Sequence, residues 1–141
     1  MNTTATLLLT AALLSASLNA QEKPTLTPTP GLAPYESYYT ARLRTIKDMS
    51  GLLQGVQDTA TAEAAVPALR PLCAELLRNE TPATENHPDS DAYAAYEAKA
   101  MAELFQAAEE LSRHIERLME ADCYASPALK KLLDDFIHGE M

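Results

Sequence analysis

The chain of 141 residues contains no tryptophan, two phenylalanines, two cysteines and four glycines. Four glycines offer little material for the phosphate-binding loops of nucleotide enzymes or for the glycine-flanked serine turn of hydrolases. The sequence also contains no Cys-x-x-Cys pair and no Glu-x-x-His motif. These absences argue against nucleophilic, redox and di-iron chemistry, and we expect a protein that is not an enzyme.

Basic residues are also scarce, since 11 Lys and Arg stand against 20 Asp and Glu and the net charge is −9. None of these charges lies in the first 20 residues, so residues 21–141 carry all of them. Nucleic acids and anionic lipid surfaces are bound mainly through clustered Lys and Arg. We therefore expect neither a nucleic-acid partner nor docking on a membrane through basic residues.

The uncharged first 20 residues contain an apolar stretch from Ala5 to Leu14. This stretch is about half as long as the roughly 20 residues that cross a bilayer. Small and polar residues follow it up to Ala20, which is the pattern of a secretory signal peptide. We expect residues 1–20 to be a signal peptide, the protein to be periplasmic or secreted, and no membrane anchor to persist after cleavage. An uncleaved hydrophobic helix is the alternative.

Residues 21–33 are rich in proline and threonine and show no apolar period. Proline removes backbone donors and favours extended chain, so this segment is predicted to be a flexible spacer. Residues 34–141 are then left as one domain, which is long enough to bury a core of its own.

From Tyr35 onward, apolar residues recur at intervals of three or four, which is the spacing of one face of a helix. Caps, first-turn prolines and terminal glycines mark the helix ends. They predict four helices: from Pro34 to Gly55, Thr59–Arg78 after the cap Asp58, the longest one after Asp89 or Ser90, and from Pro127 to Gly139 after Ser126. Pro67 and Pro71 lie inside the second helix and predict a kink or a restart near residues 65–67.

No sustained alternation of apolar and polar residues predicts a strand. The fold class is therefore predicted to be all-α, an antiparallel bundle of four helices, three long and one short at the C-terminus. The third helix carries two adjoining apolar rows, which would place it centrally in the bundle or at a dimer seam. Its charged residues are expected on the solvent face: Glu97, Lys99, Glu103, Glu109, Glu110, Arg113, Glu116, Arg117 and Glu120.

Two resemblances add to this prediction. The segment 56–65, followed by leucines at 69, 72 and 76, resembles the second-helix opening of small exported helical proteins of bacteria. The overall layout, with a loop rich in proline and acid at residues 81–90, resembles the soluble b-type cytochrome four-helix bundles of the periplasm. That resemblance implies haem between an early Met of the first helix and a late His of the fourth. Here tyrosines occupy the early positions, Met49 lies near the far end, and only His138 matches, so no cofactor is expected.

Cys73 and Cys123 raise the question of a disulfide, because thiols of exported proteins tend to oxidise. In an up-down bundle the third helix would carry Cys123 to the end opposite Cys73. A disulfide requires Cα atoms within about 7 Å. The sequence leaves an intramolecular bridge open, with Cys73 otherwise an ordinary small core residue.

The three histidines are weak candidates for metal ligands. His87 lies in an acidic loop that lacks the glycine of an EF-hand turn. His114 follows Glu110 by one helical turn, and His138 follows Asp134 in the same way. Four closely spaced Cys or His ligands, as structural zinc requires, are missing, so no metal site is predicted.

Tyrosines form the most informative pattern. Because the first and third helices of an up-down bundle run the same way, five of the six tyrosines should gather at one end. They are Tyr35, Tyr38, Tyr39, Tyr93 and Tyr96. Phenols combine a flat apolar ring with a polar tip, which suits stacking against sugars or binding of peptides. The alternative is that these rings only close the core, with their hydroxyls in water.

The leading functional hypothesis is an exported, non-catalytic helical bundle that acts as a structural or protein-interaction module. Its partner would be a second copy of the chain or another envelope or extracellular protein. The alternative is a periplasmic four-helix bundle that carries a small ligand or a cofactor such as haem or a metal. Its soft ligands would have to come from His114, His138, Met101 and Met119.

Overall fold

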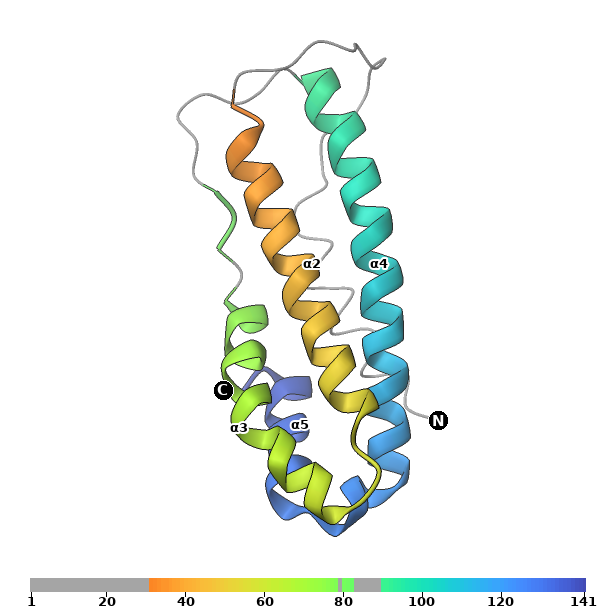
Figure 1. Ribbon diagram of the computed structural model, residues 1–141. Helices are drawn as coiled ribbons and strands as arrows, with labels where there is room; N and C mark the ends of the chain where they lie inside the picture. Colours follow the sequence, from red (N-terminus) through yellow and green to blue (C-terminus); the bar gives the residue numbers. More distant parts are fainter. Residues whose placement is uncertain (1–30, 79, 83–89) are drawn as a thin grey trace.

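The computed structural model describes residues 31–78, 80–82 and 90–141. Within these residues the protein is all-helical and contains no strand, which confirms the all-α part of the predicted fold class (Figure 1). Four α-helices pack together: α2 (Ala33–Gln54), α3 (Thr59–Leu77), α4 (Ser90–Glu120) and α5 (Pro127–His138). The predicted signal peptide, residues 21–30 of the predicted spacer and the loop with His87 lie outside the described residues.

Local sequence signals set the ends of α2 and α3 as predicted. Pro34 lies in the first turn of α2, and Gly55 follows its last residue. The Asp58 carboxylate caps α3 by accepting a hydrogen bond from the Thr61 amide at 2.7 Å. The Thr61 hydroxyl in turn accepts a hydrogen bond from the Asp58 amide at 3.0 Å. This reciprocal pair satisfies two amides that the first turn of a helix leaves without carbonyl partners.

Helix α5 also begins and ends where the sequence predicts. The Ser126 hydroxyl accepts a hydrogen bond from the Leu129 amide at 3.3 Å, and Pro127 occupies the first turn. Gly139 ends the helix with φ at 69°, a left-handed conformation that glycine adopts without steric cost.

Of the kink or restart that the sequence predicts in the second helix, the restart is wrong, and the kink stays a prediction. Helix α3 runs without interruption from Thr59 to Leu77 although Pro67 and Pro71 lie inside it. Both prolines are on the exposed face, whereas the neighbouring Val66 and Leu69 are buried. We infer that packing of the apolar face holds the helix together across the two missing backbone hydrogen bonds.

Helices α2 and α4 contact each other at both of their ends. At one end the rings of Tyr35 and Tyr93 lie 4.8 Å apart. At the other end the Arg117 guanidinium donates hydrogen bonds to the carbonyl oxygens of Leu53, at 2.8 Å, and Val56, at 3.2 Å. The two helices therefore run in the same direction, and we name the two ends of the bundle the tyrosine end and the arginine end.

More helices pack together at the arginine end than at the tyrosine end. Helix α5 starts there and has 12 residues, and α3 has 19, against 31 in α4. At 1.5 Å per residue these lengths are roughly 18, 28 and 46 Å. Figure 1 shows α3 and α5 beside the lower part of α2 and α4, while the upper turns of α2 and α4 extend beyond them. The tyrosine end is thus built mainly from α2 and α4.

A short 3-10 element that the sequence did not predict, η1 (Asp122–Ala125), joins α4 to α5. All four of its residues have φ between 49° and 59°. The left-handed region disfavours residues other than glycine by roughly 1–2 kcal/mol each. Surrounding contacts fix the turn: the Thr59 hydroxyl donates to the Tyr124 carbonyl at 2.6 Å, Lys130 pairs with Asp122, and Cys123 is fully buried.

Candidate functional site

The structure brings together the five tyrosines that the sequence placed at one end. Besides the Tyr35–Tyr93 pair, the ring of Tyr39 lies 5.3 Å from that of Tyr38 and 5.9 Å from that of Tyr96. All three pairs meet edge to face, which is a favourable geometry for aromatic rings. Tyr35 and Tyr39 belong to the core, whereas Tyr38, Tyr93 and Tyr96 are half-buried.

At the centre of this cluster lies Glu97, whose carboxylate accepts hydrogen bonds from two phenols. The Tyr39 hydroxyl donates to its Oε1 at 3.2 Å, and the Tyr93 hydroxyl donates to the same atom at 3.1 Å. Glu97 is only 6% exposed. The prediction that it lies on the solvent face is therefore wrong, and the two phenols supply the hydrogen bonds that a buried carboxylate needs.

The sequence did carry a signal for this burial. Residue 97 falls four after Tyr93 and three before Ala100, so it continues the apolar row of α4. A charged residue inside such a row must either break the row or find buried donors. Which of the two applies depends on Tyr39, 58 positions away along the chain, so helical periodicity alone does not decide it.

The phenols of Tyr39 and Tyr93 are held in their protonated form. Burial, with hydrogen bonding to Tyr93 next in importance, raises the pKa of Tyr39 far above its usual value. Burial also raises the pKa of Tyr93 to about 12. Both groups are thus hydrogen-bond donors over the whole physiological range, which suits their bonds to Glu97.

Arg42 is a second member of the site that sequence reasoning missed. It is 9% exposed, and its Nη2 donates a hydrogen bond to the Leu76 carbonyl at 3.2 Å. Its guanidinium also lies 5.9 Å from the centre of the Tyr38 ring, within cation–π range. Arg42 therefore ties the last turn of α3 to α2 and to the tyrosine cluster.

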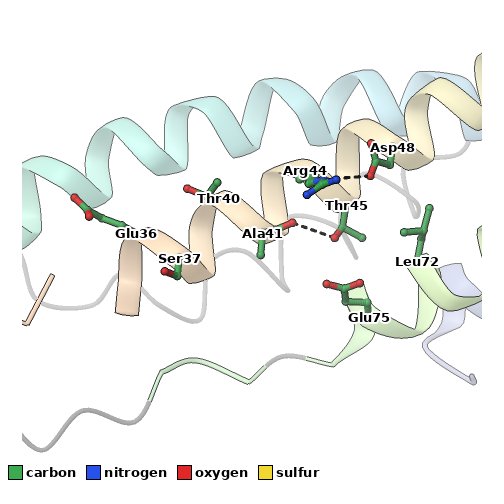
Figure 2. Close-up of a pocket in the computed structure, with 9 residues that line it drawn as sticks. All are labelled: Glu36, Ser37, Thr40, Ala41, Arg44, Thr45, Asp48, Leu72 and Glu75. Carbon is green, nitrogen blue, oxygen red and sulfur yellow. Dashed lines mark hydrogen bonds and ion pairs between the residues drawn. The ribbon is translucent and has the colours of Figure 1, made fainter. Parts of the chain in front are cut away.

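Two open grooves flank α2 near the tyrosine end. The larger, about 650 Å³, lies between α2 and α3. Figure 2 shows Leu72 and Glu75 rising from α3 toward α2, whose exposed hydroxyls and charges form the other wall. The smaller, about 360 Å³, lies between α2 and α4 and is lined by Glu36, Tyr39, Thr40, Leu43, Tyr96, Lys99, Ala100 and Glu103. Both grooves combine apolar surface with charged side chains, a composition found in many ligand-binding clefts.

The two cysteines are free and fully buried in separate places. Cys123 lies in η1. The hydrogen bond from the Thr59 hydroxyl to the Tyr124 carbonyl places this element beside the first residue of α3. Cys73 lies 14 residues further along α3, roughly 20 Å away at 1.5 Å per residue. This separation is far beyond the Cα distance that a disulfide tolerates, so the bridge that the sequence left open is not formed.

The candidate metal ligands His114, Met101 and Met119 lie on α4, and His138 lies on α5. His114 faces Glu110, with Nε2 3.9 Å from its carboxylate, and the His138 ring lies 2.8 Å from the Asp134 carbonyl. Met101 is buried in the core, and the Met119 sulfur accepts a weak hydrogen bond from the Cys123 thiol at 3.9 Å. Among the described residues, no three Cys, His, Asp or Glu side chains gather as a metal site.

No helix within the described ranges is both long and apolar enough to span a bilayer. No protein-family model matches this chain, and comparisons with curated proteins and with solved structures find no match. The two resemblances noted in the sequence therefore rest on the quoted residues alone, and any statement on function must come from the geometry of the molecule.

Proposed function

We propose that this protein is an exported, non-catalytic helical bundle that acts as a protein-interaction module, and that the tyrosine end is its binding surface. One observation carries the proposal: aromatic rings and two open grooves occur together where α2 and α4 extend beyond α5. Tyrosine offers a large contact area at a small cost in side-chain entropy, and it is enriched at protein interfaces.

The chemistry of the cluster favours binding over catalysis. Glu97, the one buried carboxylate among the described residues, already accepts two phenol hydrogen bonds. A general base must instead be free to take a proton from a substrate within hydrogen-bonding distance. We assign Glu97 the role of orienting Tyr39 and Tyr93 rather than of reacting.

Export and topology belong to the same proposal. The uncharged first 20 residues support a signal peptide, and the proline-rich segment after them supports a flexible spacer ahead of the bundle. An up-down-up-down antiparallel topology is supported by the bond between Arg42 and the last turn of α3, and by the position of η1 beside the start of α3. The net charge of −9 disfavours nucleic acid as a partner.

Site-specific photo-crosslinking in the native host tests the binding surface. A photoreactive phenylalanine derivative would replace Tyr96 at the tyrosine end, and the same residue at Arg113, an exposed position on α4, would serve as the control. We expect a discrete adduct at position 96 that the additional substitution Tyr38→Ala weakens, and none at position 113. Equal adducts at both positions, or none at position 96, would contradict the proposal.

A native mass spectrum of the exported protein tests the remaining parts. We expect a mature chain beginning at Gln21, two free thiols and no retained small molecule. A bound haem, metal or organic ligand would favour the ligand-carrying bundle instead, and a chain beginning at Met1 would refute the signal peptide. A dimer mass would identify the partner as a second copy.

A further inference from the structure

The groove between α2 and α4 has an aromatic interior. Tyr39 is 5% exposed and forms part of its lining, and Tyr96, from α4, is half-buried beside it. The two rings are inclined at 63° with centres 5.9 Å apart, so they form two non-parallel walls. Leu43 and Ala100 complete the apolar part of the lining.

Acidic groups predominate at the edge of this groove. The carboxylates of Glu36 and Glu103 line it, one from each helix, against the single ammonium of Lys99. Both carboxylates act on Tyr96: after burial, they are the next causes that raise the pKa of this phenol. A group bound over Tyr96 would therefore lie in a field set by two negative charges.

Elsewhere at the same end, the protein already holds a cation on a tyrosine ring. The Arg42 guanidinium lies over Tyr38, and a backbone carbonyl accepts one of its N–H groups. Aromatic rings attract cations because electron density is concentrated on their faces, and the attraction strengthens when water is partly excluded. The groove between α2 and α4 offers the same combination of aromatic ring and oxygen acceptors, without an arginine of its own among its lining residues.

We propose that the groove between α2 and α4 binds an organic cation, an alkylammonium or guanidinium group, against the ring of Tyr96 and between Glu36 and Glu103. This inference rests on the proposed function, because a lysine or arginine side chain of a protein partner carries such a group. A free small amine carries the same chemistry, and the experiment distinguishes the two sources.

Titration calorimetry with choline tests the cation requirement. The control ligand is 3,3-dimethylbutan-1-ol, which has nearly the same shape as choline but no charge. We expect choline to bind about tenfold more tightly than the neutral alcohol, which corresponds to about 1.4 kcal/mol, and added salt to weaken choline alone. Equal binding of the two ligands, or no binding of choline, would overturn the proposal.

Two exposed residues of the groove give variants with opposite expected effects. Glu103→Gln should weaken choline binding, and Lys99→Gln should strengthen it, each by about threefold, as expected for one partly screened charge. The matched controls are Glu109→Gln and Lys47→Gln, which make the same charge changes at exposed positions outside the groove lining. If Glu109→Gln shifts binding as much as Glu103→Gln, and Lys47→Gln as much as Lys99→Gln, the effect is one of net charge and the site is refuted.

The source of the cation is decided by a second ligand series. A short acetylated peptide with one central lysine is compared with its norleucine counterpart, which keeps the aliphatic chain without the ammonium. Tighter binding of the lysine peptide than of choline indicates a protein partner, and the reverse order indicates a small amine. If Glu103→Gln leaves both ligands unaffected while the crosslink at position 96 persists, the cation site fails and the proposed function stands.

Discussion

At each end of the bundle an arginine donates to backbone carbonyl oxygens, and the tyrosine end adds a buried carboxylate. At the arginine end, Arg117 donates to the carbonyl oxygens of Leu53 and Val56 and to the Tyr124 hydroxyl. The cation there neutralises carbonyls at the C-terminus of α2, where the helix dipole is negative. At the tyrosine end Arg42 donates in the same way to the carbonyl of Leu76, in the last turn of α3, and the buried carboxylate of Glu97 accepts hydrogen bonds from phenols.

The two ends differ in the atoms that accept these hydrogen bonds or donate them. Arg117 donates to backbone carbonyl oxygens at the end of a helix, where carbonyls lack amide partners within the helix. The hydrogen bonds of the arginine end therefore stabilise the fold. The phenols that Glu97 orients belong to side chains whose rings also line an open groove. The tyrosine end therefore combines internal hydrogen bonds with an accessible aromatic surface, which a purely structural contact does not require.

Removing the cation of the arginine end should have the largest effect. Arg117→Met keeps much of the apolar stem but removes three hydrogen bonds from a charged donor. We expect the free energy of unfolding to fall by about 3 kcal/mol, measured by urea denaturation. Arg113→Met is the control, because residue 113 is exposed, and it should change stability by less than about 0.5 kcal/mol. A similar small change at Arg117 would remove the distinction between the two ends.

Removing the anion of the tyrosine end should have a somewhat smaller effect. Glu97→Ala leaves two phenols without their acceptor and should lower the free energy of unfolding by about 2 kcal/mol. Glu97→Gln keeps a carbonyl oxygen as acceptor and should restore about half of this loss. A loss that is the same in a Tyr39→Phe and Tyr93→Phe background would show that the network is not the cause.

Alkaline pH should weaken the hydrogen bonds of Tyr39 and Tyr93 and so destabilise the protein. Because the pKa values of Tyr39 and Tyr93 are raised in the folded protein, their neutral forms favour folding. This stabilisation is fully present below about pH 10, the usual pKa of the phenol, and is lost as the pH rises toward the folded value, about 12 for Tyr93. Urea denaturation as a function of pH measures the loss.

Tyr93→Phe provides the control for the alkaline effect. This variant should lower stability at neutral pH but flatten its decline above about pH 10, because one ionising phenol is gone. An unchanged decline in this variant would show that the buried phenols do not cause the loss.

The smallest effect is expected in the turn that joins α4 to α5. Ala125 is exposed and has φ at 59°, a conformation that glycine adopts more easily. Ala125→Gly should therefore stabilise the protein by up to about 1 kcal/mol, measured by thermal unfolding. The same change at Ala128, inside α5, should destabilise it by a similar amount. Destabilisation at both positions would mean that the turn is not strained.

Sequence patterns predicted the helix ends because the signals there are local. The caps Asp58 and Ser126 accept hydrogen bonds from amides three residues away. Gly139 ends α5 because glycine adopts a positive φ without steric cost. The helical fold class and the gathering of the tyrosines follow from the same short-range patterns, once the direction of the helices is assumed.

Other features depend on contacts between residues far apart in the chain. The turn η1 contains no glycine, and part of its support comes from Thr59, 65 positions before Tyr124. Arg117 was expected on the solvent face, yet it bonds to carbonyls more than 60 positions away. The burial of Glu97 and Arg42 likewise depends on partners from other helices. Helical periodicity contains no information on such partners.

Residue-resolved hydrogen exchange tests most directly whether the arginine end secures the bundle while the tyrosine end remains open for binding. Amide protection follows the free energy of local opening, which falls where fewer elements pack together. We predict stronger protection for residues 46–53 of α2 and 106–118 of α4 than for residues 38–44 and 94–100 of the same two helices. Equal or stronger protection at the tyrosine end would contradict the account.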